Sequence, residues 1–325
     1  MSLIGFKMPN DVDDLSTIFV PIGTGPMYAT PTGFIDPNTN KDLRETFAVN
    51  TTNTILEDTK LIAQNGIDLR YIFQGFEPYI VTIGGTGTYT QNITGNKYIY
   101  TFTNGTFSNG TNTISINKNI TSFNVIVVGS GGPGRNGSTV TLGNGGGGAG
   151  FGCVTFSYVA NTIYNISVAP VSSRRIDGQT SFFRNSGGIG VTSTGGMSGT
   201  STSSVTIRAQ SGVCTNNGIG TLVSLTGGTG GAEGDPNGTN SSGSITVLGV
   251  TYNYGGGGRA GNGTSASANN KGGMPGADGV GGTGITSTIN GGDASTPGSG
   301  GGGAAWQGSS FGGFGGPGLV MIIFT

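Results

Sequence analysis

The uneven distribution of glycine constrains this chain more than any other feature of its sequence. Of 68 glycines among 325 residues, six lie before residue 84 and 62 lie from residue 84 onward. Acidic residues show the opposite bias, with ten of the 15 Asp and Glu residues before residue 84. This change in composition predicts a boundary near Ile83–Gly84, between an N-terminal module (1–83) and a glycine-rich domain (84–325).

The glycine-rich part nevertheless has the composition of an ordered protein. The chain contains 16 Phe and 10 Tyr residues, Val, Ile and Thr are abundant, and 9% of residues are charged. Disordered segments are usually poor in aromatic and β-branched residues and rich in charge. Since glycine loses more freedom on folding than any other residue, we expect subunit association to contribute to stability. The composition therefore indicates strands, tight turns and homo-oligomerisation.

Short patterned segments predict the strands. Tyr98–Phe102 and Thr113–Asn117 alternate as half-buried strands do, whereas Phe123–Val128 is more continuously apolar and is expected to run through a core. The other candidate strands are Cys153–Tyr158, Tyr164–Val168, Val205–Ala209, Ser244–Leu248 and Leu319–Phe324. An exposed edge strand as apolar as Leu319–Phe324 would be prone to aggregation. We therefore predict that it lies in the centre of a sheet, paired with Phe123–Val128.

The N-terminal module carries an internal repeat of the form Asp-Leu-x-x-x-Phe. Its copies begin at Asp14, Asp42 and Asp68, at spacings of 28 and 26 residues. In each copy the Asp can cap a short helical turn, and the Leu and Phe lie on one face of that turn. Each copy is too small to bury its apolar face, so the copies are expected to pack on one another or on a partner. The candidate assembly residues are Asp14, Leu15, Phe19, Asp42, Leu43, Phe47, Asp68, Leu69 and Phe73.

The composition argues against several classes of activity. The chain has no His, which removes the commonest general base and metal ligand, so we expect no enzyme, cofactor or metal ion. Cys153 and Cys214 are interpreted as small buried hydrophobic residues, ahead of a disulfide. A net charge of −1, with 14 dispersed basic residues, lacks the electrostatic footprint of a nucleic-acid partner. There is no apolar run of roughly 20 residues for membrane insertion and no secretory signal at the N-terminus, so synthesis in the host cytoplasm is expected.

Three local motifs have both a functional and a structural interpretation. Gly129–Gly134 follows a strand as in nucleotide-binding loops, but residues 135–150 lack the periodicity of the helix that such loops require. Glu233 and Asp235 are expected to lie in a solvated loop. Trp306, Phe311 and Phe314 are candidate surface-binding aromatics that could stack on sugars or anchor a partner, although packing within a glycine-rich core or interface is favoured.

The order of strands and glycine blocks also suggests a family. The relevant segments are Phe123–Gly132, Gly145–Gly150, Tyr164–Pro170, Asp177–Phe182 and Gly312–Ile323. Over residues 97–325 this order resembles the glycine-rich domain of phage tail-fibre proteins, adhesins and giant-virus particle proteins. It departs from the usual pattern at Ser172–Ile176, where Arg174 and Arg175 replace a glycine-rich turn. The N-terminal repeats resemble short repeats in structural proteins of large DNA viruses and phages.

The resemblance implies a rigid, protease-resistant domain in which glycine lets backbones pack closely, in extreme members as bundled polyproline II helices. The predicted fold is therefore mostly β: a glycine-rich β-sandwich or barrel-like domain, with polyproline II segments, after a small repeat-containing module. The predicted function is a non-enzymatic virion structural protein, a surface fibre or appendage component that self-assembles. Its expected partners are itself, other virion proteins and a host surface glycan. A minor capsid or cement protein, and a stand-alone carbohydrate- or ice-binding module, stay open as alternatives.

Overall fold

The computed structural model describes most of the chain after residue 80. The described residues are 20–21, 34–35, 81–94, 97–104, 110–116, 122–138, 142–159, 162–199, 208–218, 220–232, 235–262, 271–305 and 310–324. The chain divides into two compact units, Met1–Ile80 and Val81–Thr325. In the first unit, β1 (Val20–Pro21) pairs antiparallel with β2 (Phe34–Ile35). The predicted boundary at 83–84 falls inside β3 (Val81–Gly85), which pairs with a strand of the second unit.

The second unit contains two six-stranded antiparallel sheets. The first sheet consists, in spatial order, of β12 (Cys214–Asn217), β11 (Gly190–Ser193), β10 (Ser181–Asn185), β9 (Ile163–Val168), β6 (Gly110–Ile116) and β3. The second consists of β13 (Thr221–Leu225), β8 (Phe151–Ser157), β7 (Ser122–Val128), β16 (Leu319–Phe324), β5 (Lys97–Thr103) and β4 (Thr88–Thr94). The described residues contain no α-helix, and neither sheet closes into a barrel. The mostly β prediction is confirmed, and its sandwich form is the one adopted.

The central pairing of β16 is also confirmed. Leu319 lies opposite Val128 of β7 on one side and opposite Thr103 of β5 on the other. All six residues of β16 are buried. The most apolar strand of the domain therefore has no free edge, which removes the pairing hazard that its sequence would otherwise create.

Aromatic side chains fill the space between the two sheets. Phe123 of β7 has its ring centroid 5.8 Å from that of Tyr164 on β9 and 6.0 Å from that of Phe183 on β10. Tyr164 and Phe183 stack at 4.6 Å, and Phe324 of β16 lies 5.6 Å from Phe123. These rings alternate along their strands with residues that face outward, as period-two geometry requires. They join the sheets into a sandwich with one shared core.

A second apolar cluster covers the outer face of the β7–β8–β16 sheet. The hairpin β14 (Ile245–Val247) and β15 (Val250–Tyr252) supplies Ile245 and Val247, which pack with Ile126, Phe151 and Met321. Because β7 is thus buried on both faces, it lacks a polar side and reads as a continuous apolar segment.

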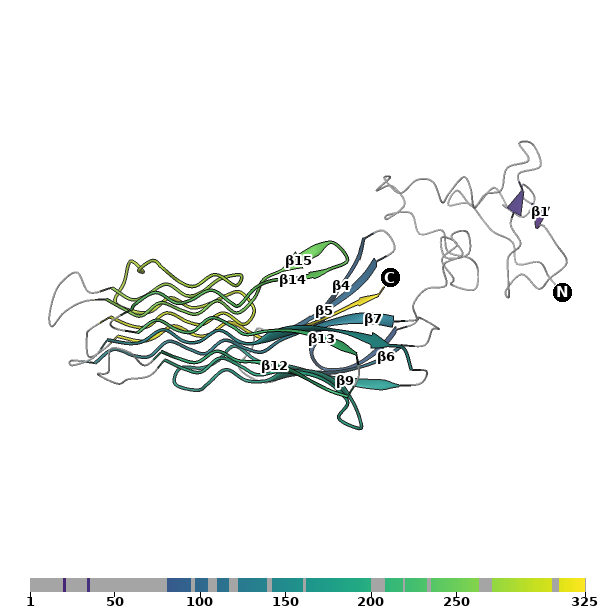
Figure 1. Ribbon diagram of the computed structural model, residues 1–325, viewed down its shortest axis with the longest axis horizontal. Coiled ribbons are helices and arrows are strands. Elements are labelled where there is room, and N and C mark those ends of the chain that lie inside the picture. The colour runs from purple at the N-terminus through teal and green to yellow at the C-terminus, as the bar shows by residue number, and fades with distance from the viewer. Residues whose placement is uncertain are drawn as a thin grey trace. The chain divides into compact units, whose positions relative to one another are not determined.

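Beyond the sandwich, glycine-rich segments lie side by side along a common axis (Figure 1). The N–H groups of residues 145 to 150 donate, in order, to the carbonyl oxygens of Gly231, Gly301, Met197, Gly228, Gly298 and Thr194. The acceptors belong to three neighbouring segments, one with Gly231 and Gly228, one with Gly301 and Gly298, and one with Met197 and Thr194. Each segment therefore accepts one hydrogen bond from every third residue. Three residues per turn without bonds inside the segment is the geometry of a polyproline II helix. We call this set of hydrogen-bonded glycine-rich segments the glycine bundle.

Most of the strands named from the sequence are present, and one is not supported. The predicted segments correspond to β5, β6, β7, β8, β9, β14 and β16. Of Val205–Ala209, residues 205–207 lie outside the described residues, and Arg208 and Ala209 belong to no strand. The strands β1–β4, β10–β13 and β15 were not predicted.

Candidate functional site

The predicted assembly residues of the N-terminal module are not among the described residues. These are Asp14, Leu15, Phe19, Asp42, Leu43, Phe47, Asp68, Leu69 and Phe73, and Trp306 also lies outside the described part of the chain. Their role in assembly therefore stays a prediction.

Phe311 and Phe314 lie together around one arginine. The guanidinium carbon of Arg174 is 4.5 Å from the ring centroid of Phe311 and 5.0 Å from that of Phe314. The Arg174 Nε donates a hydrogen bond of 3.3 Å to the carbonyl of Gly312, between the two rings. Cation–π contacts of this kind fix the arginine as well as the rings. The aromatic pair is therefore in contact with a cation of its own chain, which favours the packing interpretation, although Phe311 is 44% exposed.

The arginine turn at Ser172–Ile176 is anchored to the segment that carries these rings. Ser172 donates from its backbone N–H to the carbonyl of Gly315 at 3.3 Å, and Gly315 donates to the Ser172 hydroxyl at 3.0 Å. Arg175 adopts a φ of +69°, in the left-handed region where glycine is favoured. Arg175 thus occupies a position in this turn whose backbone conformation favours glycine.

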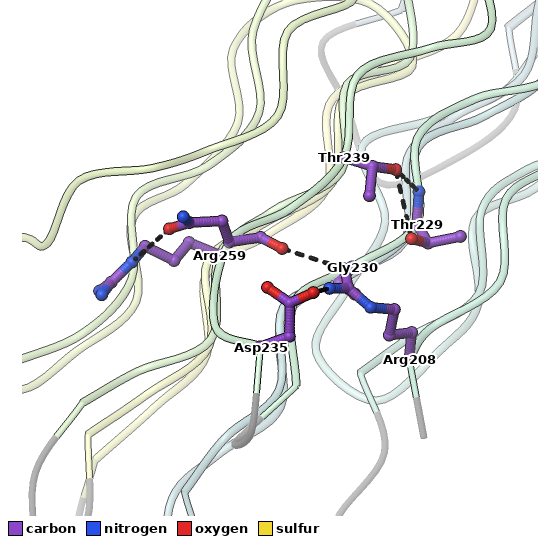
Figure 2. A network of polar contacts seen from close by, with 7 residues as sticks. Arg208, Thr229, Gly230, Asp235, Thr239 and Arg259 are labelled. Carbon is purple, nitrogen blue, oxygen red and sulfur yellow. Dashed lines mark hydrogen bonds and ion pairs between the residues drawn. The ribbon is translucent and has the colours of Figure 1, made fainter. Parts of the chain in front are cut away.

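A second polar cluster joins four segments of the glycine bundle (Figure 2). Arg208 forms an ion pair with Asp235 and donates to the carbonyl oxygens of Asn237, at 3.0 Å, and Gly230, at 3.4 Å. The Nε of Arg259 donates to the side-chain oxygen of Asn237 at 3.2 Å. Asp235 was expected in a solvated loop; its side chain is 70% exposed, and it also pairs with Arg208. The ion pair links two segments of the chain. Because the Asp235 carboxylate is exposed to solvent, the pair contributes little to the stability of the fold.

The thiols of Cys153 and Cys214 are free and buried, as their interpretation as small hydrophobic residues required. Burial raises the pKa of Cys153 to about 11 and that of Cys214 to about 12. A thiol that stays protonated at neutral pH is a poor nucleophile and a poor metal ligand.

In the described ranges, no group of three or more Cys, His, Asp or Glu residues is arranged to hold a metal ion. No helix in the part of the chain that the structure describes is long and apolar enough to cross a membrane.

The comparison with protein families decides what this architecture is. A family model described as a glycine-rich domain matches residues 103–325. The chain belongs to this glycine-rich domain family. The match takes in the glycine bundle and most of the sandwich, and it confirms the resemblance at the level of the glycine-rich domain. The search of curated proteins found no match.

One pair of outward-facing residues in the glycine-rich domain was not predicted from the sequence. Phe182 and Arg184 alternate with the buried Phe183 on β10, and the guanidinium carbon of Arg184 lies 3.8 Å from the ring centroid of Phe182. The signal was available, since a period-two pattern puts both residues on the face opposite Phe183. It was weak because β10 has two adjacent phenylalanines and no clear alternation of polarity.

Proposed function

We propose that this glycine-rich domain protein is a non-enzymatic structural component of a virus particle, a fibre or appendage at the particle surface. In this proposal the second unit, Val81–Thr325, is the displayed part, and the N-terminal repeats join copies of the chain to one another and to other particle proteins. The resemblance to tail-fibre, adhesin and giant-virus particle proteins supplies the viral setting. The glycine-rich domain itself supports the structural role.

The observation that carries the proposal is the way the glycine bundle uses its backbone. Gly146 donates to Gly301 at 2.8 Å, and the next residue, Gly147, donates to Met197 at 2.9 Å. Consecutive peptide groups are thus held by different neighbours, so no short stretch can open without breaking bonds to several segments. A protease needs several residues of extended, accessible backbone, and such a bundle withholds them. Resistance of this kind suits a protein displayed outside a cell.

The experiment compares assembly of the full-length chain with that of a fragment. The fragment begins at Val81, because β3 supplies an edge strand of the first sheet. Light scattering and negative-stain microscopy should show a defined oligomer or filament for the full-length protein and a folded monomer for residues 81–325.

A full-length variant separates the repeats from the rest of the N-terminal module. Replacing Leu15, Leu43 and Leu69 together by Asp should abolish assembly, because each leucine belongs to the predicted apolar face of one repeat. A full-length protein that is monomeric at all accessible concentrations would contradict the proposed joining role.

A further inference from the structure

The two outer faces of the sandwich are chemically different. The outer face of the β7–β8–β16 sheet is apolar and lies beneath the β14–β15 hairpin. The outer face of the β12–β3 sheet carries mainly polar side chains in rows set by the strand registers, with Ile163 and Phe182 among them. Two adjacent rows consist of Thr111, Ser167 and Phe182, and of Thr113, Asn165 and Arg184. Within the described residues, no hairpin pairs over this second face.

Arg184 is the single charged residue in the six strands of this sheet, all of which are described. Its guanidinium carbon lies 3.8 Å from the ring centroid of Phe182, and no ion pair joins it to a described carboxylate. Phe182 thus positions a planar cation on an exposed face that offers it no counter-ion. Such a guanidinium is available for a bidentate contact with a carboxylate or sulfate.

Two hollows flank this stacked pair. One, of about 540 Å³, is lined by Thr111, Thr113 and Asn165 in addition to the pair. The other, of about 490 Å³, is lined by Ser167, Gln179 and Thr192 in addition to the pair. Because Phe182 and Arg184 line both, they form a ridge between the hollows. Each volume lies within the range of small-molecule binding sites.

The rim of the larger hollow is fixed before any ligand arrives. The Asn185 side-chain oxygen accepts from the N–H of Ile189 at 3.0 Å, and Asn217 donates to the carbonyl of Gly188 at 3.2 Å. These bonds hold the β10–β11 turn, where Gly188 has a φ of +77°. A preformed rim lowers the entropic cost of binding.

We propose that this face binds an acidic saccharide. Its carboxylate or sulfate would pair with Arg184, and sugar rings on either side of the ridge would occupy the two hollows. Hydroxyl and carboxamide side chains both donate and accept hydrogen bonds, as sugar hydroxyl groups do, and the sheet offers them in rows. The absence of acidic residues from its six described strands favours an anionic ligand over a neutral or cationic one. The inference concerns a ligand and does not rest on the particle role proposed above.

The test measures binding of defined oligosaccharides to the full-length protein by isothermal titration calorimetry. The probes are a heparin-derived tetrasaccharide, which carries sulfates, a tetragalacturonate, which carries carboxylates, and neutral cellotetraose. We expect at least one acidic probe to bind more tightly than cellotetraose. Binding of the tetragalacturonate would show that a carboxylate suffices, and binding of the heparin fragment alone would show that sulfate is required. Arg184→Gln should weaken that binding by about tenfold or more, because it removes a charge-assisted contact.

Two controls keep the result specific. Arg175→Gln removes an exposed arginine at another site and should leave affinity unchanged, and the unfolding midpoint of Arg184→Gln should match that of the parent protein. Equal affinity for a single-stranded DNA oligonucleotide would overturn the saccharide proposal in favour of simple polyanion binding. Failure of both acidic probes to bind, or binding that Arg184→Gln does not change, would also overturn it.

Discussion

At the scale of single residues, the glycine bundle depends on missing side chains. A Cβ atom at Gly146 would overlap the carbonyl group of Gly132, and one at Gly302 would overlap that of Gly273. Both obstacles are backbone atoms of other segments, which cannot move aside as the end of a flexible side chain can. The sequence could predict that glycine allows close approach, but it could not predict which segments meet, because glycine carries no pattern that identifies a partner.

A pair of alanine substitutions tests this argument. Gly146→Ala should destabilise the protein by about 3 kcal/mol or more, since the backbones must separate to admit a methyl group. Gly243→Ala is the control: the nearest atom to its added Cβ would be Leu225 Cδ2, at an ordinary 3.4 Å. Urea unfolding of both variants gives the comparison, and equal stabilities would refute the role assigned to close backbone approach.

The buried thiols make stability depend on pH. In the unfolded chain a thiol ionises near its ordinary pKa of 9.0, whereas the pKa of Cys153 in the folded protein is about 11 and that of Cys214 about 12. A raised folded pKa stabilises the native state below pH 9, and this contribution is lost as pH rises towards 11. We expect the free energy of unfolding to fall by about 1 kcal/mol per thiol between pH 8 and pH 10.

Buried tyrosines act in the same direction, so the thiols need their own control. Burial also raises the pKa of Tyr164 and Tyr254. The double variant Cys153→Ala, Cys214→Ala should therefore retain a shallower loss of stability above pH 9, measured by urea unfolding at each pH. An unchanged slope would mean that the thiols do not contribute.

At the scale of elements, strands were predictable where burial follows a simple pattern. β7 and β16 are apolar because both of their faces are covered, and β6 alternates because one face is solvated. β11 escaped prediction because its buried Ser193 is polar. The Ser193 hydroxyl accepts from the N–H of Gly129 at 3.1 Å and donates to the carbonyl of Gly150, so its burial costs little. Such tertiary bonds leave no trace in local sequence.

The candidate sites also depend on tertiary contacts that local sequence does not show. Phe311 and Phe314 were recognisable as aromatics in a glycine-rich segment, but their partner Arg174 lies more than a hundred residues earlier in the chain. The rows on the outer face of the β12–β3 sheet arise from the registers of β6, β9 and β10, and no single segment shows them.

The central position of β16 leads to a prediction for one of its residues. Ile322 is fully buried between the sheets, and Ile322→Ala should cost roughly 2–5 kcal/mol because it leaves a cavity there. Ile163→Ala removes the same atoms from a residue of β9 that is 57% exposed, and should change stability by no more than about 0.5 kcal/mol. Chemical denaturation of the two variants measures both effects. Similar losses would contradict the placement of β16 at the centre of the core.

At the scale of the whole glycine-rich unit, the sandwich and the glycine bundle are built from the same segments. β7 continues directly into residues 129–138, and residues 142–150 lead directly into β8. At the junction, Gly129 donates to Gly150, and Ser130 donates to Gln179 ahead of β10. No flexible linker separates the two parts at these described crossings. They should therefore unfold together, as one cooperative unit.

Hydrogen exchange followed by mass spectrometry tests this cooperativity. If the unit is cooperative, Gly146→Ala should accelerate exchange of slowly exchanging amides in β16 and in residues 142–150 by the same factor, because both then exchange through global unfolding. β16 contains none of the residues around Gly146, so a local disturbance would not reach it. Gly243→Ala should leave both peptides unchanged. Acceleration confined to residues 142–150 would show instead that the bundle opens on its own, and the sandwich would then be a separate folding unit from which the bundle frays.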